Sequence, residues 1–255
     1  LWDVGAMGAA AVTGVANYDM MIIGEVLEST DGLGVFVRPD SPIAQATGYN
    51  PSYPNVLGSP ETVKGITMLL PIGTAQHFTA LKWLEKLGLG ITDVNIVNMD
   101  TAQAYQALQA KQCDAVSLNV PTFFDAENDG MVQVGNLADL GTRYVDMVVA
   151  NRKAVEGQPE LVQKYIDCIT EACAALNADP DMAADLFVEY LKEAGAETTR
   201  ENCVSDLSRV NFIEQKDWKE RSLGNFAKEL GEFYINLGQL EPELIDKFET
   251  NIDSE

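Results

Sequence analysis

The sequence has little positive charge and almost no histidine, and both shortages exclude classes of function. Its 255 residues include 17 Lys and Arg against 39 Asp and Glu, which gives a formal net charge of −22. Phosphate recognition needs clustered basic side chains, and the sequence has no such cluster, so we expect no nucleic-acid partner. We interpret the acidity as a well-solvated surface, with adaptation to salt or to an acidic habitat as the alternative.

Cysteine and histidine are too few and too scattered to predict a metal centre. The cysteines form no CxxC pair, and His77 is the single histidine of the chain. A zinc site built from these residues is therefore not expected, and neither is a cofactor. We interpret the four cysteines as mainly buried thiols. They are Cys113, Cys168, Cys173 and Cys203.

Long hydrophobic runs are also missing. No apolar stretch approaches the length needed to span a bilayer. The first residues lack the basic start, the apolar centre and the small-residue cleavage site of a signal peptide. The opening residues, Leu1 to Gly5, instead look like the interior of a strand with no preceding turn. We therefore expect further sequence ahead of them in the natural gene product.

The sequence does contain a regular alternation of short apolar runs and amphipathic stretches in its first three fifths. Strands are predicted over residues 3–7, 20–25, 33–37, 65–70, 94–98, 114–118, 131–134 and 144–150. Helices are predicted over 74–87, 100–110 and 121–128, and residues 40–60 look like a long loop. Beyond Asn151 the pattern is helical throughout, with helices over 159–176, from 180 onward, over 222–237 and over 241–248.

This alternation predicts an α/β fold with mostly parallel sheets and helices on both faces. In such sheets ligands bind at the carboxyl ends of the strands, where the strand order reverses. The loops after Met7, Leu70, Asn98 and Leu118 therefore become the places to look for a site.

The most informative of these loops has the sequence PIGTAQH and joins a predicted strand to a predicted helix. Its candidate binding residues are Gly73, Thr74, Ala75, Gln76 and His77. The free N–H groups at such a helix start favour an anion without any lysine. An ordinary capped turn is the alternative. His77 could donate to a ligand or act as a general base, or it could be purely structural, because no Ser, Cys or Asp nearby in sequence suggests a triad.

Two further loops hold candidate residues. The small residues after the first strand, at Met7, Gly8 and Ala9, would let a ligand approach the backbone closely, with tight helix–sheet packing as the alternative. The run is not GxGxxG, which excludes a dinucleotide-binding fold. Asn119 and Thr122 lie at the carboxyl edge of another predicted strand and could bind a polar ligand, or could simply cap the loop.

In this order the segments resemble the nitrate, sulfonate and taurine type of ABC-transporter solute-binding proteins, a group that includes relatives of the thiamine-pyrimidine precursor binders. The resemblance covers nearly the whole chain and depends on the order of five segments rather than on one diagnostic motif. They are DVGAMGAAAV, LGVFVRPDSPI, VKGITMLLPIGTAQHFTALKWLEKLGL, AYQALQAKQCDAVSLNVP and QPELVQKYIDCITEACAALNADPDMAADLF.

The resemblance implies a type II periplasmic-binding-protein fold, with two doubly wound lobes joined by a two-strand hinge and a helical C-terminal tail. Lobe I would comprise residues 1–62 and 143–255, and lobe II residues 63–142. The crossings would lie near residues 35–38 and 143–147. Family members normally begin with a strand, a helix and a strand ahead of the DVG segment, and we expect this unit to be missing from lobe I here.

The same resemblance implies the function. The chain would be the solute-binding component of an ABC importer and would capture a small organic or inorganic anion, such as a sulfonate, nitrate or carboxylate, in the interlobe cleft. The turn at Gly73 to His77 would contact the anion, and the turn around Met7 and Gly8 would contact it from the other lobe. We expect a monomer that works with a transporter permease in the periplasm or on the extracellular face, with tethering as a lipoprotein one possibility.

Two other functions fit the same fold. An enzyme similar to a pyrimidine-precursor synthase would use His77, although such a relative would carry clustered cysteines and iron, and here the cysteines are scattered. A ligand-sensing domain that docks on a receptor instead of a transporter is the other alternative. We predict binding without catalysis.

Overall fold

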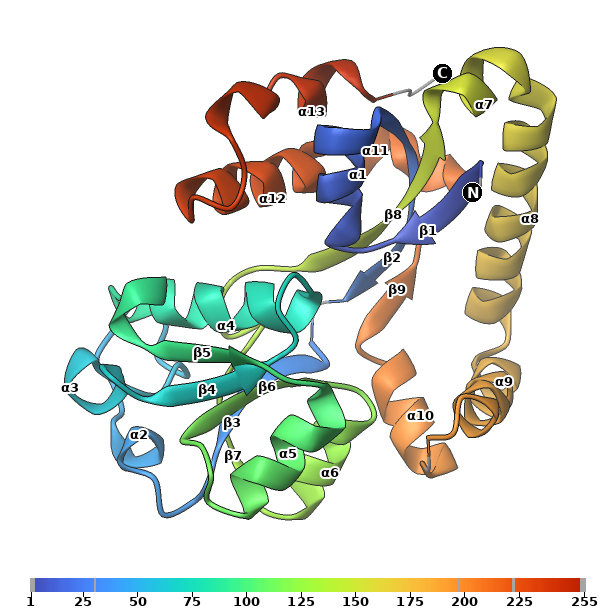
Figure 1. Ribbon diagram of the computed structural model, residues 1–255. Coiled ribbons are helices and arrows are strands. Elements are labelled where there is room, and N and C mark those ends of the chain that lie inside the picture. Colours follow the sequence, from blue (N-terminus) through green and yellow to red (C-terminus); the bar gives the residue numbers. More distant parts are fainter. Residues whose placement is uncertain (1–2, 30, 197, 222, 253–255) are drawn as a thin grey trace. The chain divides into compact units, whose positions relative to one another are not determined.

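The computed structural model describes residues 3–29, 31–196, 198–221 and 223–252 of the chain. The chain divides into two compact units (Figure 1). Unit 1 comprises Leu1–Glu28, Tyr144–Leu186 and Val210–Glu255, and unit 2 comprises Ser29–Arg143 and Phe187–Arg209. Residues 29–62 and 187–209 therefore group with unit 2, whereas the sequence prediction assigned them to lobe I.

Unit 2 is built on a sheet of five strands in the order β5-β4-β6-β3-β7. The strands are β3 (Leu33–Val37), β4 (Thr67–Leu70), β5 (Asn95–Asn98), β6 (Ala115–Asn119) and β7 (Val132–Asn136). β4 runs parallel to β5 and β6, whereas β3 runs antiparallel to β6 and β7. These pairings place β3 inside the sheet, which explains why the segment from residue 29 onward belongs to unit 2.

Helices cover both faces of this sheet. Figure 1 shows α4 (Ala75–Lys86) on one face and α5 (Thr101–Gln109) and α6 (Thr122–Asn128) on the other. The second face holds a continuous core in which Phe36, Val116 and Leu118 pack with residues of α5 and α6. Because side chains alternate along a strand, Ser117 points to the α4 face.

The region from 40 to 60 is less irregular than its composition predicts. It contains α2 (Pro42–Gln45) and leads into α3 (Pro60–Val63), and the Ile43 N–H donates to the Ser41 hydroxyl as a helix cap over 3.3 Å. Trp83 of α4 donates from its indole N–H to the Leu57 carbonyl over 3.0 Å, and the Leu57 N–H donates to the Val134 carbonyl over 2.9 Å. These bonds fix the segment to unit 2. A 3-10 turn, Ile91–Asp93, precedes β5.

Unit 1 contains a sheet of four strands in the order β1-β8-β2-β9. The strands are β1 (Val4–Met7), β2 (Met20–Ser29), β8 (Tyr144–Asn151) and β9 (Val210–Phe212). β1 is antiparallel to β8, with Met7 opposite Met147. Residues of β2 and β8, such as Ile23 and Val148, pack with Val162 and Ile166 of α8 (Pro159–Ala178) in one core cluster.

The chain after Asn151 was predicted to be helical throughout, and this prediction was wrong. A strand, β9, lies in this region and joins the unit 1 sheet. Ile213, next to β9, donates its N–H to the Val26 carbonyl over 2.9 Å. Three residues are too few to show a two-residue period, so local pattern missed it. The remaining helices are α1 (Ala10–Tyr18), α7 (Arg152–Gly157), α9 (Pro180–Glu193), α10 (Arg200–Leu207), α11 (Trp218–Arg221), α12 (Asn225–Asn236) and α13 (Lys247–Thr250), with 3-10 turns at Gln215–Asp217 and Pro242–Leu244.

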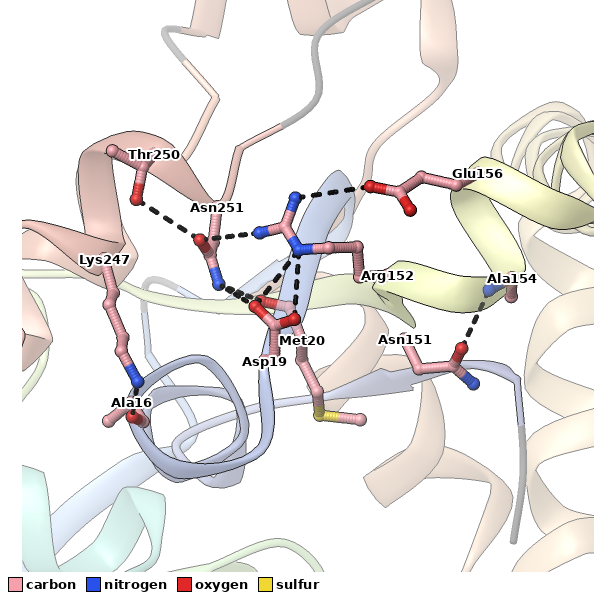
Figure 2. Close-up of polar contacts among 10 residues, drawn as sticks. All are labelled: Ala16, Asp19, Met20, Asn151, Arg152, Ala154, Glu156, Lys247, Thr250 and Asn251. Atoms are coloured by element: carbon pink, nitrogen blue, oxygen red, sulfur yellow. Dashed lines mark hydrogen bonds and ion pairs between the residues drawn. The ribbon is translucent and has the colours of Figure 1, made fainter.

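A polar cluster fastens the C-terminal helix to the start of unit 1 (Figure 2). Arg152 donates from Nε to both carboxylate oxygens of Asp19, over 3.1 and 3.0 Å, and from Nη2 to Asn251 Oδ1 over 3.0 Å. Asn251 donates in turn to the Met20 carbonyl over 3.1 Å. The Ile22 N–H then donates to the Asn251 carbonyl over 2.8 Å, so this cluster has a structural role.

Three of the cysteines are buried as free thiols, as predicted, but Cys168 is exposed. It lies on α8, whose buried residues are Val162, Ile166 and Cys173. Cys168 therefore faces solvent, and the prediction was wrong for this residue. In the parts of the chain that the structure describes, no helix is both long and apolar enough to cross a bilayer.

Candidate functional site

The start of α4 forms the first candidate site, in unit 2. Gly73 has φ +79°, a left-handed conformation that costs glycine little, and it turns the chain from β4 into the helix. Thr74 is the N-cap residue with extended backbone angles, φ −113° and ψ 178°. Phe78 donates its N–H to the Thr74 carbonyl over 3.1 Å as the first helical bond. The N–H groups of Ala75, Gln76 and His77 precede that bond and have no acceptor within the helix.

Side chains around the turn hold its shape without covering these amides. The Thr74 hydroxyl donates to the Pro71 carbonyl over 2.7 Å and makes no cap bond to the helix. The Ile72 N–H donates to Asn98 Oδ1 over 2.9 Å, and the Gly73 N–H donates to His77 Nδ1 over 3.3 Å. The two amides ahead of the helix therefore have acceptors, whereas no acceptor among the described residues bonds to the amides of its first turn.

Gln76 connects the ends of three strands. Its side-chain amide donates to Asn119 Oδ1 over 2.8 Å and to the Thr101 hydroxyl over 3.1 Å. Asn119 is the last residue of β6, as predicted, and Thr101 opens α5 directly after the β5 loop. Since β4, β5 and β6 are parallel, their carboxyl ends meet at one edge of the sheet. The structure thus brings Gly73, Thr74, Ala75, Gln76 and Asn119 together.

Two members of this cluster, Asn98 and Thr101, were not predicted as site residues, and the predicted Thr122 is not among its hydrogen-bonded members. Thr122 is half-buried at the start of α6, and no hydrogen bond within the described ranges joins it to Gln76. The sequence held a signal for Asn98, because this residue ends a predicted strand and the loop after it was one of the expected site positions. Which side chain of that loop would reach Ile72 depends on the register between β4 and β5, which local sequence does not reveal.

His77 is fully buried beneath the turn, with an exposed fraction of 0%. Burial lowers the pKa of its imidazole, so the neutral ring is favoured. Because Nδ1 accepts from the Gly73 N–H, the proton of the neutral ring resides on Nε2. That Nε2 has no hydrogen-bond partner among the residues that the structure describes. The geometry makes His77 an acceptor that shapes the turn.

The second candidate site is the Gly8 turn of unit 1. Met7 ends β1, and Ala9, the residue before α1, donates its N–H to the Tyr144 hydroxyl. A Cβ atom on Gly8 would lie 2.7 Å from Asp146 Oδ1 and would also clash with the Tyr144 hydroxyl. Only glycine fits this close approach without a shift. Met7, Gly8 and Ala9 thus lie together, in a different unit from the α4 turn.

Tyr144 and Asp146 were not predicted as site residues. Burial raises the pKa of the half-buried Asp146 carboxyl to about 6. It also raises the pKa of the Tyr144 phenol well above its usual value. A signal existed in the sequence, since Asp146 is the one acidic residue in the strand YVDMVVAN. The pairing of β8 with β1, which brings it beside Gly8, is a long-range contact that local pattern does not show.

Chemically, the two turns offer different groups. The α4 turn presents backbone and side-chain amides at the positive end of a helix dipole, which suits an anion. The Gly8 turn presents a carboxyl and a phenol hydroxyl. Within the described ranges, no group of three His, Cys, Asp or Glu side chains is placed to hold a metal ion.

Comparison with known proteins gives a family match. Residues 53–183 match the model of a family described as NMT1/THI5 like. A protein of Brachyspira hyodysenteriae named as an ABC transporter periplasmic binding protein is 34% identical over 255 residues. The alignment covers 100% of this chain and 74% of that protein.

Solved structures share the fold. The alkanesulfonate-binding protein SsuA from Xanthomonas axonopodis pv. citri, bound to MOPS, superposes with a TM-score of 0.71 at 17% identity, covering 98% of this chain and 80% of that one. The desulfurization enzyme DSZB superposes with a TM-score of 0.64 at 16% identity, covering 97% and 85%. The predicted fold of type II periplasmic binding proteins is confirmed, and both a binding protein and an enzyme use it.

Proposed function

Because this chain belongs to the NMT1/THI5-like family of solute-binding proteins, we propose that it is the solute-binding component of an ABC importer. It captures a small anion reversibly and performs no chemistry on it. Its partners are the anionic ligand and the transporter permease, and it works as a monomer in the periplasm or on the extracellular face, where a lipid anchor would tether it.

The start of α4 carries this proposal. The N–H groups of Ala75, Gln76 and His77 lie at the positive end of a helix, and the contacts that shape the turn come from neutral groups. Such a site holds an anion through backbone donors and the helix dipole rather than through a lysine. It suits sulfonate, nitrate or carboxylate groups.

A sulfonate is our first choice among these anions. The structural neighbour SsuA is an alkanesulfonate-binding protein and is bound to MOPS. We further propose that the Met7, Gly8 and Ala9 turn, together with Asn119 and Thr122, contributes ligand contacts, since these residues follow the carboxyl ends of strands.

The state of the titratable groups favours binding over catalysis. His77 is buried and its Nδ1 is occupied by the Gly73 N–H, so a role as general base would require this contact to break. Burial raises the pKa of the Cys113 thiol to about 11, which leaves it protonated and unreactive near neutral pH. A catalytic role for His77 therefore has less support than a role in shaping the turn.

Calorimetric titration with ethanesulfonate, taurine, nitrate and acetate tests the proposal. The decisive variant is Ala75→Pro, which removes one N–H from the first helical position, where proline is well tolerated. Thr74 already has the extended conformation that a residue before proline requires. We expect the variant to fold and to bind the preferred anion about 10- to 100-fold more weakly, because one charge-assisted hydrogen bond is lost.

The matched control is Ala75→Gly, which keeps the N–H and should bind within a few-fold of the wild type. If no anion of the panel binds to the wild type, the proposed function is wrong. Equal affinities for the wild type and Ala75→Pro would show that the anion binds elsewhere. Conversion of any tested solute into a product would instead favour the enzyme alternative, with His77→Gln then losing turnover.

A further inference from the structure

The side chain of Gln76 acts as a donor to two neighbours at the carboxyl edge of the unit 2 sheet. It is buried, with an exposed fraction of 6%. Its Nε2 donates to Asn119 Oδ1 over 2.8 Å and to the Thr101 hydroxyl oxygen over 3.1 Å. A carboxamide nitrogen carries two protons, so both are used in these bonds. Each neighbour is therefore held through its oxygen.

Holding these two side chains by their oxygens leaves their donors pointing elsewhere. In the Asn119 carboxamide, Nδ2 lies on the side opposite to Oδ1 and so faces away from Gln76. The Thr101 proton is likewise directed away, because the hydroxyl oxygen accepts from Gln76. Neither donor has an acceptor among the residues that the structure describes. Since both residues are half-buried rather than enclosed in the core, their donors remain for an outside group.

Asn98, at the end of the neighbouring strand β5, shows the same polarity through an independent contact. Its Oδ1 accepts from the Ile72 N–H over 2.9 Å. A backbone N–H can only donate, so this contact fixes which end of the Asn98 amide faces the turn. His77 also follows the pattern, since its Nδ1 accepts from the Gly73 N–H. These side chains thus use their acceptors within the protein and keep their donors for other partners.

We propose that Gln76 is a positioning residue, which turns the donors of Asn119 and Thr101 toward the anion bound at the start of α4. This inference rests on the proposed function, because it assumes that the anion binds there. An anion offers acceptors only, so donors turned toward it form charge-assisted hydrogen bonds, whereas a carbonyl oxygen turned toward it repels it. Without the bond from Gln76, the Asn119 amide would rotate between these two orientations.

The substitution Gln76→Met tests this role without adding a charge, because methionine has a similar length and volume but cannot donate. Calorimetric titration should show ethanesulfonate binding about 10-fold more weakly to this variant, since Asn119 and Thr101 lose their fixed orientation. The matched control is Gln109→Met. Gln109 is an exposed glutamine at the other end of α5, whose Nε2 donates to Asp129 Oδ2 over 2.8 Å, and its variant should bind as the wild type does.

A double-mutant cycle shows whether Gln76 acts through its neighbour. If it does, Gln76→Met should weaken ethanesulfonate binding much less in an Asn119→Ala background than in the wild type, because the group that it positions is already gone. Losses that simply add would mean that the two side chains act independently, and the positioning role would be wrong.

The ratio of two affinities gives a readout that a merely structural role would not move. Ethanesulfonamide has the skeleton of ethanesulfonate but carries an NH2 donor in place of one oxygen. The wild type should favour the sulfonate, since the edge presents donors to it. In Gln76→Met the freed Asn119 amide can turn Oδ1 toward the NH2 group, so this preference should narrow. An equal weakening of both probes would show that the substitution only disturbs the structure.

Side-chain amide exchange, followed by nuclear magnetic resonance in the ligand-free wild type, tests the polarity directly. The Nε2 protons of Gln76 should exchange slowly with water, because both are hydrogen-bonded and buried. Those of Asn119 should exchange fast and become protected when ethanesulfonate is added. Loss of the respective signals in Gln76→Met and Asn119→Ala assigns them. Slow exchange at Asn119 with fast exchange at Gln76 would overturn the inference.

The outcomes separate this inference from the proposed function. A wild type that binds ethanesulfonate no more tightly than a folded Gln76→Met variant would overturn the role of Gln76 and leave the anion site intact. Failure of every anion of the panel to bind the wild type would overturn the proposed function and, with it, the premise of this inference. The exchange pattern of the ligand-free protein is measured independently of either result.

Discussion

At the residue scale, burial decides what His77 can do. The imidazole lies under the α4 turn, its Nδ1 accepts from the Gly73 N–H, and burial lowers its pKa. A cationic imidazolium would have two N–H donors and no acceptor, so protonation would break the bond to Gly73. His77 therefore fixes the turn in its neutral form, and under the proposed function it would support anion binding through this contact and not by adding a positive charge.

Nuclear magnetic resonance can test this state of His77 without ambiguity, because the chain has one histidine. We expect the ¹⁵N signals of the ring to show the Nε2–H tautomer at pH 7 and a pKa below 6.5. A ring that titrates above 6.5, or that carries its proton on Nδ1, would contradict the geometry.

The same pKa shift predicts a pH dependence of stability. The folded-state pKa is lower than the unfolded one, so the native state binds fewer protons over that interval. The contribution of His77 to stability is fully present above pH 6.5 and is lost as the pH falls through the folded-state value. In His77→Asn the amide oxygen can still accept from Gly73. Denaturant titrations of this variant should show a shallower loss of stability below pH 6.5.

At the scale of the elements, a buried ion pair fastens α11 to β2. Glu25 has an exposed fraction of 1%, and Arg221 Nε donates to its Oε2 over 2.8 Å while another guanidinium nitrogen pairs with Glu28. Trp218, also in α11, donates its indole N–H to the Glu25 carbonyl over 2.8 Å. A four-residue helix has little stability of its own, so these contacts determine its position.

Removal of the arginine should therefore be costly. Arg221→Ala would leave the buried Glu25 carboxylate without its partner, and we expect the free energy of unfolding to fall by about 3–5 kcal/mol. The control is Lys216→Ala, because the Lys216 side chain is exposed and its pair with Glu214, at 2.9 Å, is screened by solvent, so its removal should change the free energy of unfolding far less. Urea denaturation measures both changes. Equal effects for the two variants would show that Glu25 is not desolvated.

Sequence pattern predicted the elements best where they are long and amphipathic. The alternation from β4 to β7 is confirmed, and each predicted strand and helix in that series occurs. The prediction failed for α7, α10 and β9, which are short and whose positions depend on contacts remote in sequence. The Gln76 bond to Asn119 could be anticipated only in part: the pattern placed both residues at strand ends but not their side chains.

At the scale of the whole molecule, the fold was predictable and the division of the chain was predictable only in part. β3 belongs to unit 2 because it pairs with β6 and β7, and no local pattern in residues 33–37 distinguishes these partners from those of another sheet. Residues 187–209 group with unit 2 for a similar reason, since Arg209 lies over the Phe123 and Phe124 rings. The predicted return of the chain near residue 143 agrees with the boundary at Arg143 and Tyr144.

A crystal structure of the protein with ethanesulfonate bound would test the central claim most directly. The account predicts density for the sulfonate at the start of α4, with its oxygens within about 3.2 Å of the amide nitrogens of Ala75 and Gln76. Density for the ligand at another place, or protein acceptors already bonded to those two amides, would contradict it.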